Sequence, residues 1–442
     1  MTADAQSPPD SAAGLGWPLY AFYCAGFVMV GGGFVLYTSG ADPRLVREAA
    51  AGSPISQLIL AMFYSVGALL LISNAGSRRM LKAVWPILLL PALALVSTLW
   101  SPDPALSLRR AVAFMGTILF GLSLGSAYRF RDTLGLVAFS MALVMALSIG
   151  LAYLDPVRAI HQPDDAIQAV HAGSWRGIFA HRNTLGFWAG ASLVILALAG
   201  REAFPSRWLQ VIAIVAAAAC LLATGSRAGI AVVVLGMFYF LIVVSTLNRP
   251  ARLQGAMIVF WALAGLLAYL SFEEIARVGL WLLGRESDLS GRTHLWSYIV
   301  TLVRSADRPL GLGYFVGTLL LDERISAATQ WRNVNAHNGF LEAYVYFGWM
   351  GLVLSMALAL WLLLATARLA RLGVAHVGYL AAVPAAVVFF VLAHNLVEST
   401  IVSPNNLNNV LLAIAAAMAA RASLPEGSAR RSFTTRTLRE PS

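Results

Sequence analysis

The chain has little charge, few cysteines and almost no lysine. Charged residues make up 12% of its 442 residues and hydrophobic residues 59%, with a mean hydropathy of +0.73. A soluble globular protein of this composition would expose too much apolar surface to water, so that class is excluded. The two cysteines, Cys24 and Cys220, lie inside apolar runs. This predicts buried small side chains rather than a disulfide or a metal framework.

Several chemical motifs are missing as well. Asp164-Asp165 and Glu273-Glu274 are isolated acidic pairs, whereas magnesium and manganese sites gather several carboxylates, so we expect neither a metal nor another cofactor. The glycine run from Gly311 to Gly317 resembles a phosphate loop but follows no predicted strand, which argues against nucleotide binding. The first sixteen residues hold no Lys or Arg, so we expect the first apolar segment to be an uncleaved anchor.

What the chain does have is a series of apolar runs. A bilayer core needs about 20 apolar residues per helical span. By that criterion about twelve spans are predicted, at 17–39, 55–74, 82–100, 108–126, 132–154, 183–200, 207–223, 227–246, 253–271, 337–365, 377–396 and 404–421. The predicted fold class is an all-α polytopic membrane protein. We expect one transmembrane domain over residues 1–421, with a large, partly helical loop at 272–336, and a disordered basic tail over 422–442.

Basic residues predict the orientation of the spans. Arg and Lys fill every second turn, and the C-terminal tail is also basic, so the positive-inside rule assigns these turns and both termini to the cytoplasm. Yet about half of the 31 basic residues fall on the other side, seven of them in the loop 272–336. Two explanations remain open: a generally arginine-rich composition, since Lys82 is the only lysine, or an anionic ligand on the outer face.

Five polar clusters are predicted to lie on this outer face. They are Trp100–Arg110, Arg176–Asn183, Ser226-Arg227, Arg292–Arg304 and His337-Asn338. His337 precedes span ten, where the positive end of the helix dipole favours a neutral imidazole that can accept a proton. His337 is therefore the candidate catalytic residue, with Asn338 beside it in the substrate site. The alternative is that both residues only cap the helix.

The remaining clusters predict a site for an anion. Guanidinium groups without acidic neighbours are well satisfied by phosphate oxygens, so Arg176, His181, Arg182 and Asn183 are candidate binding residues. Asn183 alone is also a good N-cap for span six, and solvated loop charges are the competing explanation. Arg227 begins span eight after a tight Thr224–Ser226 turn, where a cation opposes the helix dipole.

Arg292 is a weaker candidate, because charges in long loops are usually solvated, and Arg109 and Arg110 are weaker still. A helix is predicted to begin near Arg292, capped by Ser290. Its residues Leu295, Ile299, Leu302 and Val303 share one face at helical spacing. This pattern indicates an amphipathic helix on the bundle or in the membrane interface.

Taken together, these segments resemble the bacterial O-antigen ligase and polymerase superfamily. The resemblance is carried by WSPDPALSLRRA (100–111), RGIFAHRNTLG (176–186), TGSRAG (224–229), GRTHLW with PLGLGYF (291–315) and HNGFLEAYVYFGWMGL (337–352). It implies a glycosyltransferase of the GT-C type that faces the periplasm, uses no metal, and takes a glycan from undecaprenyl pyrophosphate. O-antigen ligases attach that glycan to lipid A–core oligosaccharide. The resemblance assigns the motif histidine to His337 and pyrophosphate contacts to Arg182 and Arg227.

Two classes of function follow. The first is inverting glycosyl transfer in the bacterial inner membrane by an O-antigen ligase, or by a polymerase or protein O-oligosaccharyltransferase of the same superfamily. The second is a flippase or transporter for lipid-linked glycans, which would also offer arginines to a pyrophosphate. A transporter should carry polar residues through its spans, and the sequence shows none there. No nucleic-acid partner is expected; the predicted partners are the two lipid-borne substrates and membrane lipids.

Overall fold

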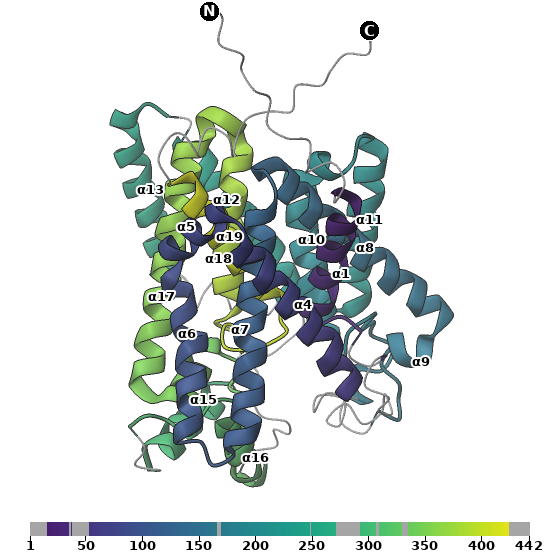
Figure 1. Ribbon diagram of the computed structural model, residues 1–442, viewed down its shortest axis with the longest axis vertical. Helices are drawn as coiled ribbons and strands as arrows, with labels where there is room; N and C mark the ends of the chain where they lie inside the picture. Colours follow the sequence, from purple (N-terminus) through teal and green to yellow (C-terminus); the bar gives the residue numbers. More distant parts are fainter. Residues whose placement is uncertain are drawn as a thin grey trace, which may run out of the picture.

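The computed structural model describes residues 16–34, 37, 53–165, 169–247, 249–270, 292–305, 309–328 and 335–423. Within those ranges the chain is α-helical, with a few 3₁₀ turns and one isolated β-bridge between Ile160 and Trp175 (Figure 1). This confirms the predicted all-α class. The helices are α1 (Gly16–Val30), α4 (Pro54–Ser73), α5 (Ala75–Ala83), α6 (Trp85–Val96), α7 (Pro104–Ala127), α8 (Phe130–Leu154), α9 (Pro156–Ala159), α10 (Arg182–Ala203), α11 (Arg207–Thr224), α12 (Arg227–Leu247), α13 (Ala251–Leu270), α15 (Arg292–Ser305), α16 (Val316–Ala328), α17 (Gly339–Val377), α18 (Val383–His394) and α19 (Leu407–Ala422).

The helices are built to cross a membrane. Among the described residues, seven helices are long and apolar enough to do so, or eight if α5 and α6, which are bent by 77°, form one span. Each predicted span overlaps a helix, and the protein is a polytopic membrane protein. The count of twelve spans stays a prediction, because α1 and α19 have only 15 and 16 residues.

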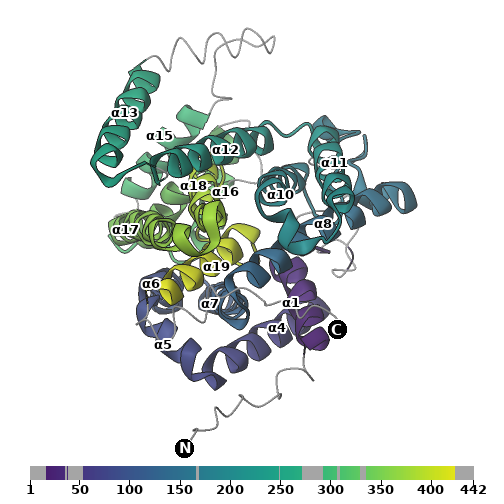
Figure 2. The ribbon, with the colours of Figure 1, turned by 90° about the horizontal axis from the view of Figure 1, so that it is seen from above.

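The bundle has a buried centre and a lipid-facing exterior. Helix α19 packs against α7, α17 and α18, and α10 packs against α8, α11 and α12, so these two helices form the interior (Figure 2). In the most apolar window of α10, 78% of the residues are buried, against 17% in α4 and α12. The outer helices therefore turn large apolar side chains outward, as a bilayer permits. Cys24 and Cys220 are both free and buried, as predicted.

Glycines let α10 and α12 approach closely. A Cβ on Gly190 would lie 2.4 Å from the Gly229 carbonyl oxygen, and a Cβ on Gly229 would lie 2.3 Å from the Gly186 carbonyl oxygen. Helices inside a membrane gain no hydrophobic driving force from packing together. Small residues at a crossing let their backbones come close enough for strong van der Waals contact. The crossing lies in the first turn of α12 and one to two turns inside α10, so it brings the starts of the two helices, at Arg182 and Arg227, close together.

Helix α17 is continuous where the sequence predicted a break near residue 365, and it is kinked at Gly348 instead. Gly348 has φ 63° and ψ −152°, a conformation that favours glycine. The kink frees carbonyl groups, and the Gly311–Gly313 turn satisfies them. The amides of Leu312 and Gly313 donate to the carbonyls of Val345 and Tyr346 at 2.9 and 3.1 Å. Since those amides are used, the glycine run is a structural plug for α17 and has no phosphate-loop geometry.

The loop between α13 and α17 has its own helices, α15 and α16. Helix α15 begins at Arg292 as predicted and buries Leu295, Ile299 and Val303, while Arg304 is exposed. The amphipathic interpretation of this segment is therefore confirmed. The proposed cap Ser290 and the tail beyond residue 423 lie outside the described residues, and the domain bounds 1–421 and 422–442 stay predictions.

The α10–α12 crossing can be tested by adding volume at Gly190. We expect Gly190→Val to lower thermal stability by about 1–3 kcal/mol, because the new side chain must force the two backbones apart. The matched control is Gly150→Val in α8, where nothing lies within 4 Å of the added Cβ. Thermal unfolding of the purified variants measures the difference. Equal melting temperatures for the two variants would contradict the close crossing.

Candidate functional site

The turn before α17 holds His337 in an unusual backbone conformation. Its φ is 46°, a left-handed value that costs a non-glycine residue about 1–2 kcal/mol. Contacts must therefore hold it, and the His337 amide donates to Asn335 Oδ1 at 3.0 Å. Asn338 Oδ1 accepts the amides of Phe340 and Leu341, so Asn338 is the N-cap of α17. The capping interpretation is confirmed for Asn338, and its role in substrate binding stays a prediction.

A buried carboxylate ties this turn to the segment after α18. Glu342 is 2% exposed and accepts three hydrogen bonds. Its Oε2 accepts from the Ala336 amide at 2.7 Å and from Ser399 Oγ at 3.0 Å, and its Oε1 accepts from the Tyr346 hydroxyl at 2.5 Å. Ser399 Oγ in turn accepts the Asn338 amide at 3.1 Å. These bonds fix the segment around Ser399 against the turn that carries His337.

That arrangement brings Glu398 to His337. Glu398 Oε2 lies 3.2 Å from His337 Nδ1, and Glu398 Oε1 accepts a hydrogen bond from Asn183 Nδ2 at 3.3 Å. Both side chains of the His337–Glu398 pair are mostly buried, at 21% and 14% exposure. A carboxylate only accepts, so in the neutral ring Nδ1 carries the proton and Nε2 has the lone pair. Glu398, which follows α18, thus joins the start of α10 to the start of α17.

Sequence reasoning missed Glu398. Its carboxylate belongs to a connection between two apolar helices, and its partners are 61 and 215 residues away. The signal that could have found it is its position: an acidic residue in a short connection between two apolar spans calls for a cationic or hydrogen-bonding partner.

At the start of α10, the cap is His181 and not Asn183 as predicted. His181 Nδ1 accepts the Asn183 amide at 3.0 Å, because residue 181 has the extended backbone of an N-cap. Because His181 caps the helix, the Asn183 side chain does not, and it donates to Glu398 instead. The predicted pair His181 and Asn183 therefore lies at the same site as His337. Whether these residues contact substrate stays a prediction.

Arg176 is a structural residue by its geometry. It is fully buried, and its guanidinium donates to the carbonyls of Arg158 and Val157 and to Asp165 Oδ2, at 2.9, 3.1 and 3.3 Å. Asp165 Oδ2 also lies 3.0 Å from His161 Nδ1. With its donors used inside the protein, Arg176 gives no support to the predicted pyrophosphate contact. It holds the loop that precedes α10.

The same loop gathers three histidines. The ring centroids of His161, His171 and His181 are 5.5–5.9 Å apart in all three pairs. His161 Nε2 accepts the Arg182 amide at 3.2 Å, so the Arg176 network reaches the first residue of α10. Burial lowers the pKa of His161 to about 4 and that of His181 to about 3, and it also lowers the pKa of His171. Among the described residues, no group of His, Cys, Asp or Glu side chains is arranged to hold a metal ion.

Arg182 and Arg227 form the cationic part of the site. Arg182 Nη1 donates to the Thr224 carbonyl at 3.2 Å, across the left-handed Gly225 turn that ends α11, so Arg182 lies beside the start of α12. The charges of Arg182 and Arg227 are close enough to repel each other. In the described part of the chain, no carboxylate pairs with either arginine, and the buried Nε of Arg182 has no hydrogen-bond partner. Two neighbouring guanidinium groups in this state favour a bound anion.

Two other predicted arginines have different outcomes. The Arg110 guanidinium stacks over the Phe315 ring at 4.3 Å, which gives it a packing role. Arg292 is the first residue of α15, but its side chain lies outside the described residues, so its binding role stays a prediction.

Comparison with known proteins shows what the chain is similar to. The sequence model of the O-antigen ligase family matches residues 212–356, a segment that contains Arg227 and His337. The exopolysaccharide production protein ExoQ of Rhizobium meliloti (strain 1021) is 26% identical over 278 residues. Both matches support the predicted resemblance to the O-antigen ligase and polymerase superfamily. The match to ExoQ spans 59% of this chain and 60% of that protein.

The family match and the geometry overlap only in part. Arg227, His337 and Asn338 lie within the matched residues, whereas Arg182, Asn183 and Glu398 lie outside them. The hydrogen bonds of Glu398 therefore join the matched segment to the helices on either side of it.

The buried histidines predict a dependence of stability on pH. Their folded pKa values lie below the ordinary 6.5, so between these values the unfolded chain binds more protons and stability falls as pH falls. We expect the melting temperature to drop from pH 6.5 to pH 5. His181→Asn keeps a capping side chain but removes one titrating ring. It should flatten the dependence by at most about 1.4 kcal/mol per pH unit.

The control is His376→Asn, which removes an exposed ring at the far end of α17. Differential scanning fluorimetry over this pH range measures both variants. A pH dependence that is the same in His181→Asn and in the unsubstituted protein would show that His181 is not titrated in the way its burial requires.

Proposed function

We propose that the protein is an O-antigen ligase of the bacterial inner membrane. It transfers a glycan from undecaprenyl pyrophosphate to a hydroxyl group of lipid A–core oligosaccharide, with the site facing the periplasm and both termini in the cytoplasm. The observation that carries the proposal is the hydrogen-bonded row His337–Glu398–Asn183, which lies beside the arginines at the starts of α10 and α12. Transfer of a sugar from a pyrophosphate requires a proton acceptor for the attacking hydroxyl and an anion site for the leaving group, close to each other.

His337 acts as the general base. Its Nε2 accepts the proton of the acceptor hydroxyl while that oxygen attacks the anomeric carbon of the donor sugar. Glu398 holds Nδ1–H, so it fixes both the tautomer and the direction of the ring. General base assistance of this kind is worth about 10²–10⁴-fold in rate.

The arginines act on the leaving group. As the new glycosidic bond forms, the bond from the anomeric carbon to the pyrophosphate oxygen breaks, and the electron pair leaves with that oxygen. Arg182 and Arg227 stabilise the growing negative charge with charge-assisted hydrogen bonds. The helix dipoles of α10 and α12 add positive potential at the same point, because Arg182 and Arg227 are the first residues of those helices.

Attack from the side opposite to the pyrophosphate inverts the anomeric configuration. Polymerisation and protein glycosylation would use the same residues with another acceptor, and a flippase would use the arginines without a base. The identity of the acceptor therefore distinguishes the three possible enzymes from one another. Formation of a covalent product distinguishes any of them from a flippase.

Reconstitution tests the proposal directly. The purified protein in nanodiscs is mixed with undecaprenyl-pyrophosphate-linked O-antigen and with lipid A–core, and the products are separated by gel electrophoresis. We expect ligated lipopolysaccharide, and we expect His337→Ala to lower kcat by about 10²–10⁴-fold, because the base is lost. Glu398→Gln should lower kcat less than Glu398→Ala, since the amide oxygen still accepts from Nδ1.

His376→Ala, at the other end of α17, is the matched control and should retain full activity. Chain extension on the donor lipid would identify a polymerase instead, and movement of the donor across the bilayer without product would identify a transporter. Full activity of His337→Ala would remove the histidine from the mechanism.

The anion site makes a separate prediction. Replacing Arg182 or Arg227 with Gln removes a charged hydrogen bond worth about 1.5–3 kcal/mol, so donor binding should weaken at least about tenfold. Arg201→Gln, at the opposite end of α10, is the control. Binding of undecaprenyl pyrophosphate to the purified variants, followed by intrinsic fluorescence, measures the effect. Unchanged affinity in both variants would contradict the anion site.

A further inference from the structure

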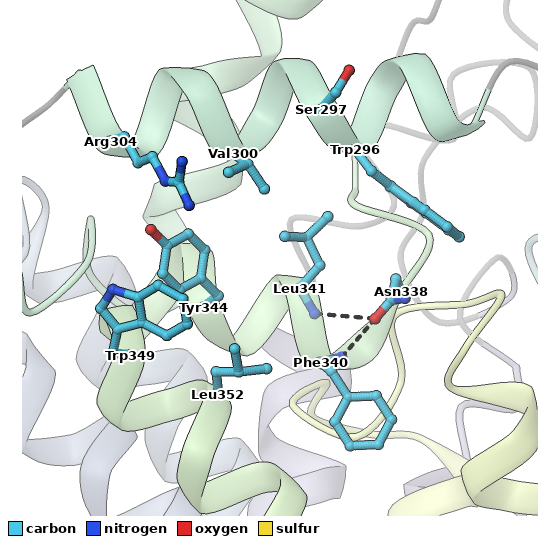
Figure 3. A pocket seen from close by; sticks show the side chains of 10 residues that line it. All are labelled: Trp296, Ser297, Val300, Arg304, Asn338, Phe340, Leu341, Tyr344, Trp349 and Leu352. Carbon is cyan, nitrogen blue, oxygen red and sulfur yellow. Dashed lines mark hydrogen bonds between the residues drawn. The ribbon is translucent and has the colours of Figure 1, made fainter.

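A groove lies between α15 and the first turns of α17, and the steps described above assign no role to it. Its volume is about 560 Å³, within the range of about 300–1,000 Å³ that is usual for ligand sites. Figure 3 shows side chains of both helices facing each other across it. The lining residues are Trp296, Ser297, Val300, Arg304, Asn338, Phe340, Leu341, Tyr344, Trp349 and Leu352.

One end of the groove is the turn that carries His337. Asn338 belongs to the wall, and Trp296 Nε1 donates to the Ala336 carbonyl at 2.8 Å, so the groove begins next to the candidate base. The groove is lined by α15 and the start of α17, whereas Arg182 and Arg227 begin α10 and α12, and α18 packs against both α17 and α10 (Figure 2). In an inverting displacement the nucleophile enters opposite to the leaving group. The groove is therefore on the side of the nucleophile.

The walls fit a sugar chain. Four of the ten lining residues are aromatic, and the C–H faces of a pyranose stack on aromatic rings while its hydroxyl groups point out of an open groove. The roof, α15, exposes the polar side chains of Ser297, Thr301 and Arg304, which suit the polar surface of the membrane better than its hydrocarbon core. From Trp296 to Arg304 the helix rises about 12 Å, which gives room for a short oligosaccharide.

The far end of the groove is cationic. There the Arg304 guanidinium lies near the Tyr344 hydroxyl and Trp349 (Figure 3). By contrast, the polar atoms at the near end are already used, since Asn338 Oδ1 caps α17 and Ser297 Oγ donates to the His294 carbonyl. Arg304 thus supplies the groove with a charge, and a guanidinium in this position selects a phosphate or carboxylate.

We propose that this groove is the acceptor subsite: it binds an anionic oligosaccharide whose rings lie on Trp296, Phe340, Tyr344 and Trp349, with its acidic substituent on Arg304 and its reactive hydroxyl at His337. The assignment rests on the proposed function for the identity of the reaction. It adds the location of the acceptor and a charge requirement on it.

The test measures acceptor binding apart from transfer. The probe is core oligosaccharide, freed of lipid and taken from lipopolysaccharide that lacks O-antigen, and its dephosphorylated form. Binding to the full-length protein in nanodiscs is followed by isothermal titration calorimetry. We expect Arg304→Gln to weaken binding of the phosphorylated probe about tenfold or more, and Trp349→Ala to weaken binding of both probes. Neither variant should change the affinity for undecaprenyl pyrophosphate.

The chain offers matched controls. Arg324→Gln changes an exposed arginine on α16 outside the groove, and Trp85→Ala removes a tryptophan that is 58% exposed, against 59% for Trp349. Groove variants that bind the phosphorylated probe as tightly as the controls do would overturn the proposal. So would competition by undecaprenyl phosphate without a glycan, which would assign the groove to a hydrocarbon chain. If the probe binds as expected but no glycan is transferred, the proposed function fails and the oligosaccharide subsite stands.

Discussion

Backbone groups without hydrogen bonds cost several kcal/mol each in hydrocarbon, and this constraint determines where chemistry can occur in the protein. Polar side chains with a functional geometry lie at helix ends. His337 precedes α17, Arg182 and Arg227 begin α10 and α12, and Glu398 follows α18. Because three of these ends are N-termini, their partial positive charges add at one place. The architecture thus creates a positive potential before any arginine side chain is considered.

Glu398 is what makes these helix ends a single site. Without it, the α17 turn and the start of α10 would have no direct side-chain hydrogen bond, because Asn183 and His337 both bond to its carboxylate. Its position depends on Glu342 and Ser399, which in turn depend on the kink at Gly348 and the turn that plugs it. A substitution in the glycine run would therefore act on the site through α17, since the carbonyls that the run binds lie about two helical turns after His337.

The sequence allowed the periodic features to be predicted, since hydrophobic spacing and helix caps are local. The spans, the tight turn before Arg227 and the buried face of α15 are of this kind. The pairings of Glu398, Asp165 and Glu342 were not predictable, because each depends on which loops meet after folding. The cap of α10 shows the limit most clearly. Asn183 has the better capping propensity, yet the helix begins earlier, with His181 as its cap. The Asn183 side chain donates to Glu398 instead.

The excess of arginine on the predicted outer face has more than one cause. Arg158 pairs with Asp155 at 2.8 Å, Arg176 with Asp165, and Arg110 stacks on Phe315, so these three stabilise loops and helix packing. Arg182 and Arg227 differ, because the glycine crossing of α10 and α12 brings the starts of the two helices together and the two charges repel each other. Two like charges placed close together repel each other when no anion is bound. Because folding has already placed them there, an anion binds without having to bring the two charges together. Structural contacts explain the first group, and the proposed anion site concerns the second.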